Sequence, residues 1–140
     1  MNMTAKLVLG VLIGLLVAAG GGWLWGVSGE RATARSLDAV ELRSDLVEGR
    51  GRLLEARVDL YNVNFGNASR HLEDARTALR RAAARLKNLG RGDDAGRVDA
   101  TLKKIDESQQ MAGKLDQGSN SRVAEAVAAV DDVLWPAQPR

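Results

Sequence analysis

Few side chains in this sequence have the type and spacing that catalysis or metal binding requires. His71 is the only histidine, there is no cysteine, and the carboxylates do not lie at ligand spacing from the histidine. A pair such as His71 and Met111 can ligate a haem iron, but no other residue supports a cofactor pocket. We therefore expect no catalytic residue, no cofactor and no bound metal, and we predict that the protein is not an enzyme.

The most concentrated charge is basic and lies in the middle of the chain. Its candidate anion-binding side chains are Arg76, Arg80, Arg81, Arg85 and Lys87. Such a surface could bind phosphate, anionic lipid or an acidic polysaccharide. These arginines and lysine also flank a leucine–alanine stripe on both sides, as the solvated face of an ordinary helix does. The net charge of the whole chain is only +2, so no nucleic-acid partner is expected.

Residues 7–27 carry no charge and are mostly apolar. As a helix with about 1.5 Å of rise per residue they would span roughly 31 Å, close to the ~30 Å hydrocarbon core of a bilayer. Trp23 and Trp25 are typical of a membrane interface. The run predicts a transmembrane signal-anchor after a short stub over residues 1–6. The alternative is a cleaved signal, with Ala18-Ala19-Gly20 as the cleavage site, and a secreted protein.

Two features of the sequence give opposite indications of the side of the membrane on which the C-terminal domain lies. A short tail before a signal-like helix favours export of the C-terminal domain, whereas Arg31, Arg35 and Arg43 soon after the run favour a cytoplasmic C-terminus. We expect a single-pass protein of the bacterial inner membrane with its C-terminal domain outside the cytoplasm. The cytoplasmic orientation is the alternative.

Small residues recur every four positions within the uncharged run. They are Gly10, Gly14, Ala18, Gly22 and Gly26. This spacing places them along one side of a helix, where they let two helix backbones approach closely in a membrane. The pattern predicts self-association of the transmembrane helix. A homo-oligomer is therefore the expected assembly, and another envelope protein is the alternative partner.

The remaining residues, about 110 of them, are enough for one small domain, and their apolar spacing is helical throughout. We predict an all-α fold in which residues 28–44 form a stalk and residues 45–135 form an antiparallel bundle of about four helices, the first one long. Residues 136–140 are a tail. The later helices are expected over about residues 68–89, 97–116 and 122–135, with Gly66 as a left-handed cap before the first of them and Leu115 facing the core.

One face of the long first helix follows alternating three- and four-residue spacing. Its members are Leu37, Val40, Val47, Leu54, Val58, Tyr61 and Phe65, with the small residues Ser44 and Gly51 between them. Leu46, Leu53 and Leu60 widen this face, which suits packing against more than one neighbour. We therefore expect this widened face to be the side of the helix that packs within the bundle.

A short sequence pattern returns 52 residues later in the chain. Gly66, Ser69-Arg70 and Glu73 are matched by Gly118, Ser121-Arg122 and Glu125. The match could record a duplicated helical hairpin, or chance combined with shared capping chemistry. Taken together, the sequence predicts a membrane-anchored, non-catalytic structural or interaction protein of the bacterial envelope. The alternative is an anion- or ligand-binding helical bundle that acts as a sensor or carrier.

Overall fold

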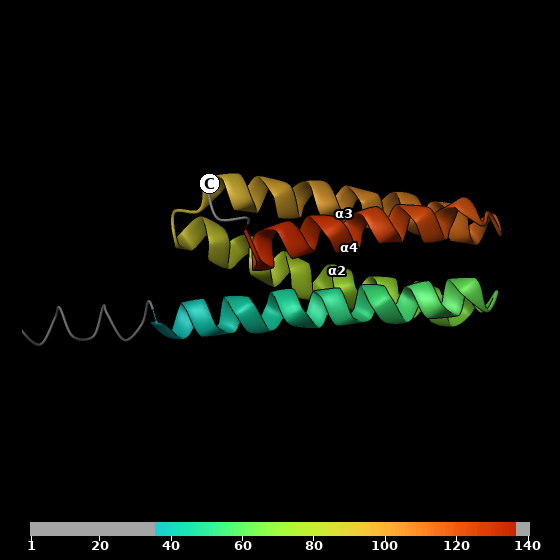
Figure 1. Cartoon of the computed structure of the whole chain (residues 1–140), viewed down its shortest axis with the longest axis horizontal. Coiled ribbons are helices and arrows are strands. Elements are labelled where there is room, and N and C mark those ends of the chain that lie inside the picture. The colour runs from blue at the N-terminus through green and yellow to red at the C-terminus, as the bar shows by residue number, and fades with distance from the viewer. Residues whose placement is uncertain (1–35, 137–140) are drawn as a thin grey trace, which may run out of the picture. The chain divides into compact units, whose positions relative to one another are not determined.

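The computed structural model describes residues 36–136, and within that range it contains four helices and no strand (Figure 1). The first helix covers residues 36–61 and is followed by α2 (Phe65–Asn88), α3 (Gly92–Gly113) and α4 (Gly118–Leu134). The predicted all-α class is confirmed. The predicted transmembrane helix over residues 7–27, with its five small residues, lies outside the described residues. Among the helices of residues 36–136, none is both long enough and apolar enough to cross a membrane.

The helices pack side by side, and consecutive helices run in opposite directions (Figure 1). The first helix and α4 are also antiparallel. Arg50 of the first helix contacts Asp131 of α4, and the later Arg57 contacts the earlier Asn120. The first helix also contacts α2, and α3 packs against both α2 and α4. Within the described residues, the chain from Asp38 to Pro136 forms one compact unit.

The core is built from leucine, valine, isoleucine and alanine contributed by all four helices. The predicted leucine–alanine stripe of α2 is confirmed over Leu72, Ala75, Leu79, Ala82 and Leu86, which are fully buried, while its last member, Leu89, follows the helix and is partly buried. Each buried leucine contributes roughly 1.5–3 kcal/mol relative to an exposed one. The alanines between the leucines let the neighbouring helices approach this stripe closely.

The buried face of the first helix agrees with the predicted one only in part: Leu46, Leu53 and Leu60, which were expected to widen that face, are in the core, but the valine row is not. The core residues of the helix are Leu42, Leu46, Leu53, Ala56 and Leu60, whereas Val40, Val47, Val58 and Tyr61 are exposed. Both rows have three- and four-residue spacing, and at about 100° per residue they lie on nearly opposite sides of the helix. The inner row contains only leucine, alanine and glycine, whereas the outer row carries the hydroxyl groups of Ser44 and Tyr61, so burial of the inner row leaves no polar side-chain group without water.

Helix α3 begins at Gly92, about five residues before the predicted start. The two glycines and two aspartates of this segment favour a loop on sequence grounds. Asp93 and Asp94 lie in the first turn of the helix, where negative charge interacts favourably with the helix dipole. Asp94 also pairs with Arg91 at 2.7 Å. These interactions offset the poor helix propensity of the glycines. Helix α4 likewise begins earlier than predicted, at Gly118.

The two turns at the end of the bundle away from Asp38 share one geometry. Val63 and Leu115, which are 52 residues apart, have positive φ angles of 58° and 57°. This is the same offset as that of the sequence match, and it favours a duplicated hairpin. Gly66 is therefore not the left-handed residue, because it lies inside α2. Leu115 does not face the core as predicted, because the turn directs it into solvent.

Candidate interaction surfaces

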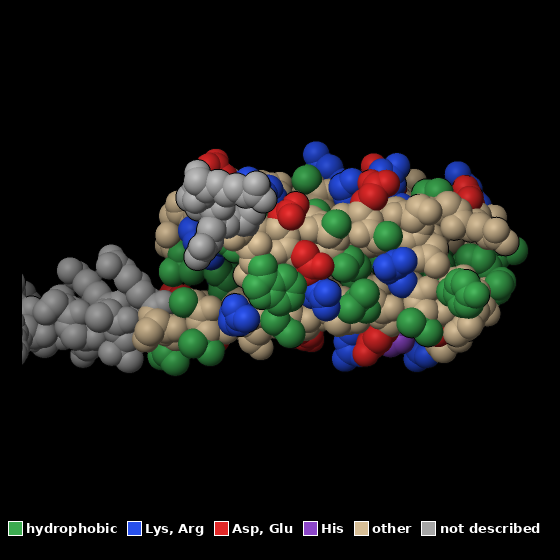
Figure 2. All heavy atoms as spheres, in the orientation of Figure 1, with side chains coloured by type: hydrophobic (Ala, Val, Ile, Leu, Met, Phe, Trp, Pro, Cys, Tyr) green, Lys and Arg blue, Asp and Glu red, His purple; other side chains and the backbone are tan. Residues whose placement is uncertain are grey.

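The first helix carries an exposed apolar row along the side opposite the core, which we call the outer stripe. It consists of Val40, Ser44, Val47, Gly51, Leu54, Val58 and Tyr61. Val40 is 68% exposed, Val58 60% and Tyr61 82%, and Leu54 alone among the larger residues also packs on the core. Hydrophobic side chains alternate with charged ones over this part of the surface (Figure 2). The bundle itself therefore leaves a full apolar face without cover.

Two rows of opposite charge border the outer stripe. The glutamate row, on the side of α2, consists of Glu41, Glu48 and Glu55. The arginine row, on the side of α4, consists of Arg43, Arg50 and Arg57. Arg50 donates to Asp131 at 2.5 Å and lies over the ring of Trp135, whereas Arg43 is exposed and has no ion-pair partner within residues 36–136. The seven-residue spacing of like charges could have revealed both rows from the sequence.

The predicted anion-binding side chains lie together on α2, but four of the five are paired with carboxylates. Arg76 contacts Glu73 and Asp106, and Lys87 contacts Asp99 at 3.1 Å. Arg81 and Arg85 contact acidic residues of the first helix. Arg80 is exposed, and among the described residues it has no carboxylate within ion-pair distance. Most of the positive charge is therefore neutralised within the bundle.

Asp45 is the centre of the contact between the first helix and α2. It is 7% exposed and accepts hydrogen bonds from Arg81 Nε at 2.8 Å and from Arg85 Nε at 3.0 Å. These bonds are the largest cause that raises the pKa of each guanidinium above its ordinary value. A shared, nearly buried carboxylate holds the two arginines in fixed positions, so they serve the packing of the first helix on α2.

His71 lies between two carboxylates of the first helix. Its Nδ1 is 3.0 Å from Glu55 Oε2, and its Nε2 is 3.4 Å from Asp59 Oδ2. Both ring nitrogens therefore face acidic side chains rather than an open ligand position. Within residues 36–136, no group of three or more potential metal-binding side chains is present. This arrangement gives no support to a haem site at His71 and Met111.

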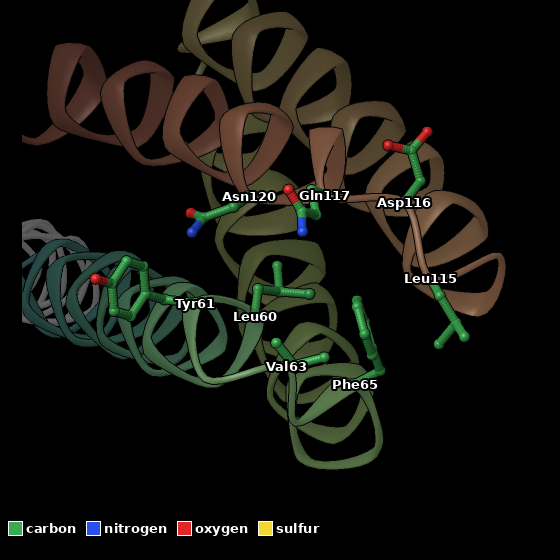
Figure 3. A pocket seen from close by; sticks show the side chains of 8 residues that line it. All are labelled: Leu60, Tyr61, Val63, Phe65, Leu115, Asp116, Gln117 and Asn120. Carbon is green, nitrogen blue, oxygen red and sulfur yellow. The ribbon is translucent and has the colours of Figure 1, made fainter.

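A hollow of about 410 Å³ opens at the end of the bundle where the two turns meet (Figure 3). Its apolar lining consists of Leu60, Tyr61, Val63, Phe65 and Leu115. Its polar lining consists of Asp116, Gln117 and Asn120. The volume falls within the range of small-molecule pockets. The sequence did not indicate this site, because its shape depends on the left-handed conformations of Val63 and Leu115.

No protein-family model, curated protein or solved structure matches this chain. Its function therefore has to be inferred from its own residues.

Proposed function

We propose that this protein is a membrane-tethered, non-catalytic interaction module of the bacterial envelope. The observation that carries the proposal is the outer stripe, an apolar helix face that the folded bundle leaves in solvent. A contiguous exposed apolar surface is typical of a protein–protein interaction site. No comparable observation supports catalysis, because the sequence contains no cysteine and its single histidine lies between two carboxylates.

The position of the stripe in the sequence supports a partner close to the bilayer. Val40 follows Val27, the last residue of the predicted membrane helix, by only 13 residues. Even a fully extended chain of that length reaches at most about 47 Å. A partner that covers the stripe would therefore be another envelope protein or a second anchored copy of this chain. We place the anchor in the inner membrane and the bundle outside the cytoplasm, with the opposite orientation and a secreted form as alternatives.

Membrane fractionation of the full-length protein tests the anchor. We expect wild-type protein to sediment with bacterial membranes and to resist extraction at alkaline pH. Leu12→Arg combined with Leu16→Arg should release it, because charge at the centre of a membrane helix costs about 2.5–3.5 kcal/mol per residue. Leu12→Ile with Leu16→Ile is the matched control and should stay in the membrane. Wild-type protein found in the supernatant with residues 1–27 still attached would overturn the proposal.

A ligand-binding bundle is the second candidate, and the hollow between the two turns favours it. Under this alternative, the full-length protein would bind an apolar fluorescent probe saturably. Leu115→Asp would abolish the binding, while Val58→Asp on the outer stripe would not. Its anion-binding form predicts salt-sensitive binding to anionic vesicles that Arg80→Glu weakens. Failure of both assays would leave the interaction module as the better explanation.

A further inference from the structure

The outer stripe has the spacing of a coiled-coil seam. Its residues follow one another at alternating steps of four and three from Val40 to Tyr61, as the a and d positions of a two-stranded coiled coil do. The core row of the same helix has this spacing as well, and it is occupied by the other helices of the bundle. The first helix therefore carries two seams on opposite sides, and only the inner one is filled within the chain.

The charge rows indicate both the identity and the direction of the partner. In a parallel coiled coil, the residue before an a position lies beside the residue five positions later on the other helix. Two parallel copies of this helix would place Arg43 beside Glu48 and Arg50 beside Glu55 of the other copy. In an antiparallel pair, arginine would face arginine and glutamate would face glutamate. The surface is therefore complementary to itself in the parallel direction.

Gly51 adds an independent observation. A Cβ atom added at this position would meet no atom within 4 Å, so packing within the chain gives no reason for glycine rather than alanine there. Glycine inside a helix is less favourable than alanine. Gly51 and Ser44 both lie on the outer stripe, where small residues would let a second helix approach closely. A seam between two copies therefore accounts for a glycine that the bundle alone does not explain.

We infer that the outer stripe binds a second copy of this chain in parallel and in register, with Arg43–Glu48 and Arg50–Glu55 pairs between the copies. This inference deepens the proposed function and rests on it, because two chains anchored by residues 7–27 in one bilayer enter the pairing in the same direction. Arg81 and Asp131 hold Glu48 and Arg50 from within each bundle, so these two charges are already placed at the edges of the seam.

Disulfide crosslinking in membranes tests the seam, and the chain contains no cysteine of its own. Full-length variants with Val40→Cys, Val47→Cys or Val58→Cys should each form disulfide-linked dimers under mild oxidation. Lys103→Cys, which lies on the exposed side of α3, is the control and should stay monomeric. A parallel, in-register seam links every position to its own counterpart. An antiparallel pair would link at most the positions near one crossing point.

Charge exchange tests the pairing itself. In the Val47→Cys background, Arg43→Glu should lower the yield of dimer about tenfold, because two attractive pairs become repulsive. Arg43 has no ion pair within the described part of the chain, so this change spares the fold. Glu48→Arg should have a similar effect. Co-expression of the two variants should restore crosslinking as a heterodimer, since the introduced glutamate would then face the introduced arginine and the remaining Arg43 would face the remaining Glu48.

The outcomes separate the dimer from the anchor. Seam cysteines that stay monomeric, in membranes that still retain the full-length protein, would overturn the dimer and leave the proposed function intact. Crosslinking at one position only would overturn the parallel register. If the full-length protein leaves the membrane, the proposed function fails, and the same cysteine scan on that protein in solution still confirms or refutes the dimer.

Discussion

Gly49 and Gly51 lie two residues apart in one helix, yet we expect alanine at the two positions to change stability in opposite directions. At Gly51, no atom lies within 4 Å of the added Cβ. Gly51→Ala should therefore stabilise the bundle by about 1 kcal/mol, because alanine is the better helix former. At Gly49, the added Cβ would lie 2.8 Å from both Cγ and Cδ2 of Leu79, a fully buried side chain of α2.

The clash at Gly49 cancels or outweighs the gain in helix propensity. Because Cγ is the branch point of Leu79, rotation of a terminal methyl group does not relieve the contact, and overpacking of this kind costs about 1–3 kcal/mol. After the propensity gain of about 1 kcal/mol, Gly49→Ala should be neutral to about 2 kcal/mol destabilising. The two variants should thus differ by about 1–3 kcal/mol, with each kcal/mol shifting Tm by about 4–8 °C in a domain of this size.

Thermal unfolding followed by circular dichroism at 222 nm measures this difference. The full-length variants are compared in one detergent, at a dilution where the Val47→Cys variant gives no crosslinked dimer. Equal stabilisation by both alanines would refute the reasoning. It would mean that Leu79 has room to move and that the close contact between the first helix and α2 is not rigid.

Three further predictions, made with four substitutions, concern other parts of the bundle and are tested by the same thermal unfolding measurement. Asp45→Asn should destabilise by about 2–4 kcal/mol, because it removes a nearly buried charge from between two arginines, whereas Asp99→Asn in an exposed pair should cost at most about 1 kcal/mol. Hydrogen bonding from Arg76 lowers the pKa of Glu73. The stability that ionised Glu73 contributes is therefore complete above the ordinary carboxyl pKa and is lost as the pH falls through the lowered pKa. Glu73→Gln should reduce the fall of Tm at acid pH. Val63→Gly should stabilise by roughly 1 kcal/mol, since glycine adopts the positive φ without strain, and an unchanged Tm would argue against that conformation.

The sequence was sufficient for helices that have one apolar face. In α2, leucine and alanine recur along a single stripe with charges elsewhere, so the spacing alone identified the buried residues Leu72, Leu79 and Leu86. In the first helix, two apolar rows have the same spacing, and periodicity could not decide between them. The choice depends on the area that each row buries and on the neighbours it meets, and neither is a property of one helix alone.

The two turns could not be predicted because their left-handed residues are Val63 and Leu115. Such side chains disfavour positive φ, and nearby Gly66 and Gly118 are the residues that a sequence pattern associates with it. A non-glycine residue keeps this conformation only where its surroundings hold it. At the first turn, Asn64 N donates to Asp59 O at 2.8 Å. The equivalent bond of the second turn runs from Asp116 N to Met111 O at 3.0 Å. The hollow between the turns was missed for the same reason.

The partial error in the first helix also explains why the pairing of Arg81 and Arg85 with that helix was not predicted. The predicted face included the valine row, and with that row buried Asp45 and Glu48 would not lie next to α2. Because the valines are exposed and the leucine row alone is buried, the glutamate row turns toward α2 and meets Arg81 and Arg85. Whether the arginines of α2 are free to bind an anion therefore depends on which face of the first helix is buried. The sequence of α2 alone does not determine that face.

The charge rows also explain why the first helix does not rotate to bury its outer stripe. A half-turn about its axis would bring Val40, Val47 and Val58 to the core, but it would exchange the two rows. The arginine row would then lie beside the basic side of α2, and the glutamate row would lie beside Asp131 of α4. Leucine burial and charge pairing thus select the same face. The face that remains outside fits a neighbour with the same two rows in the same order, which a second, parallel copy of this helix provides.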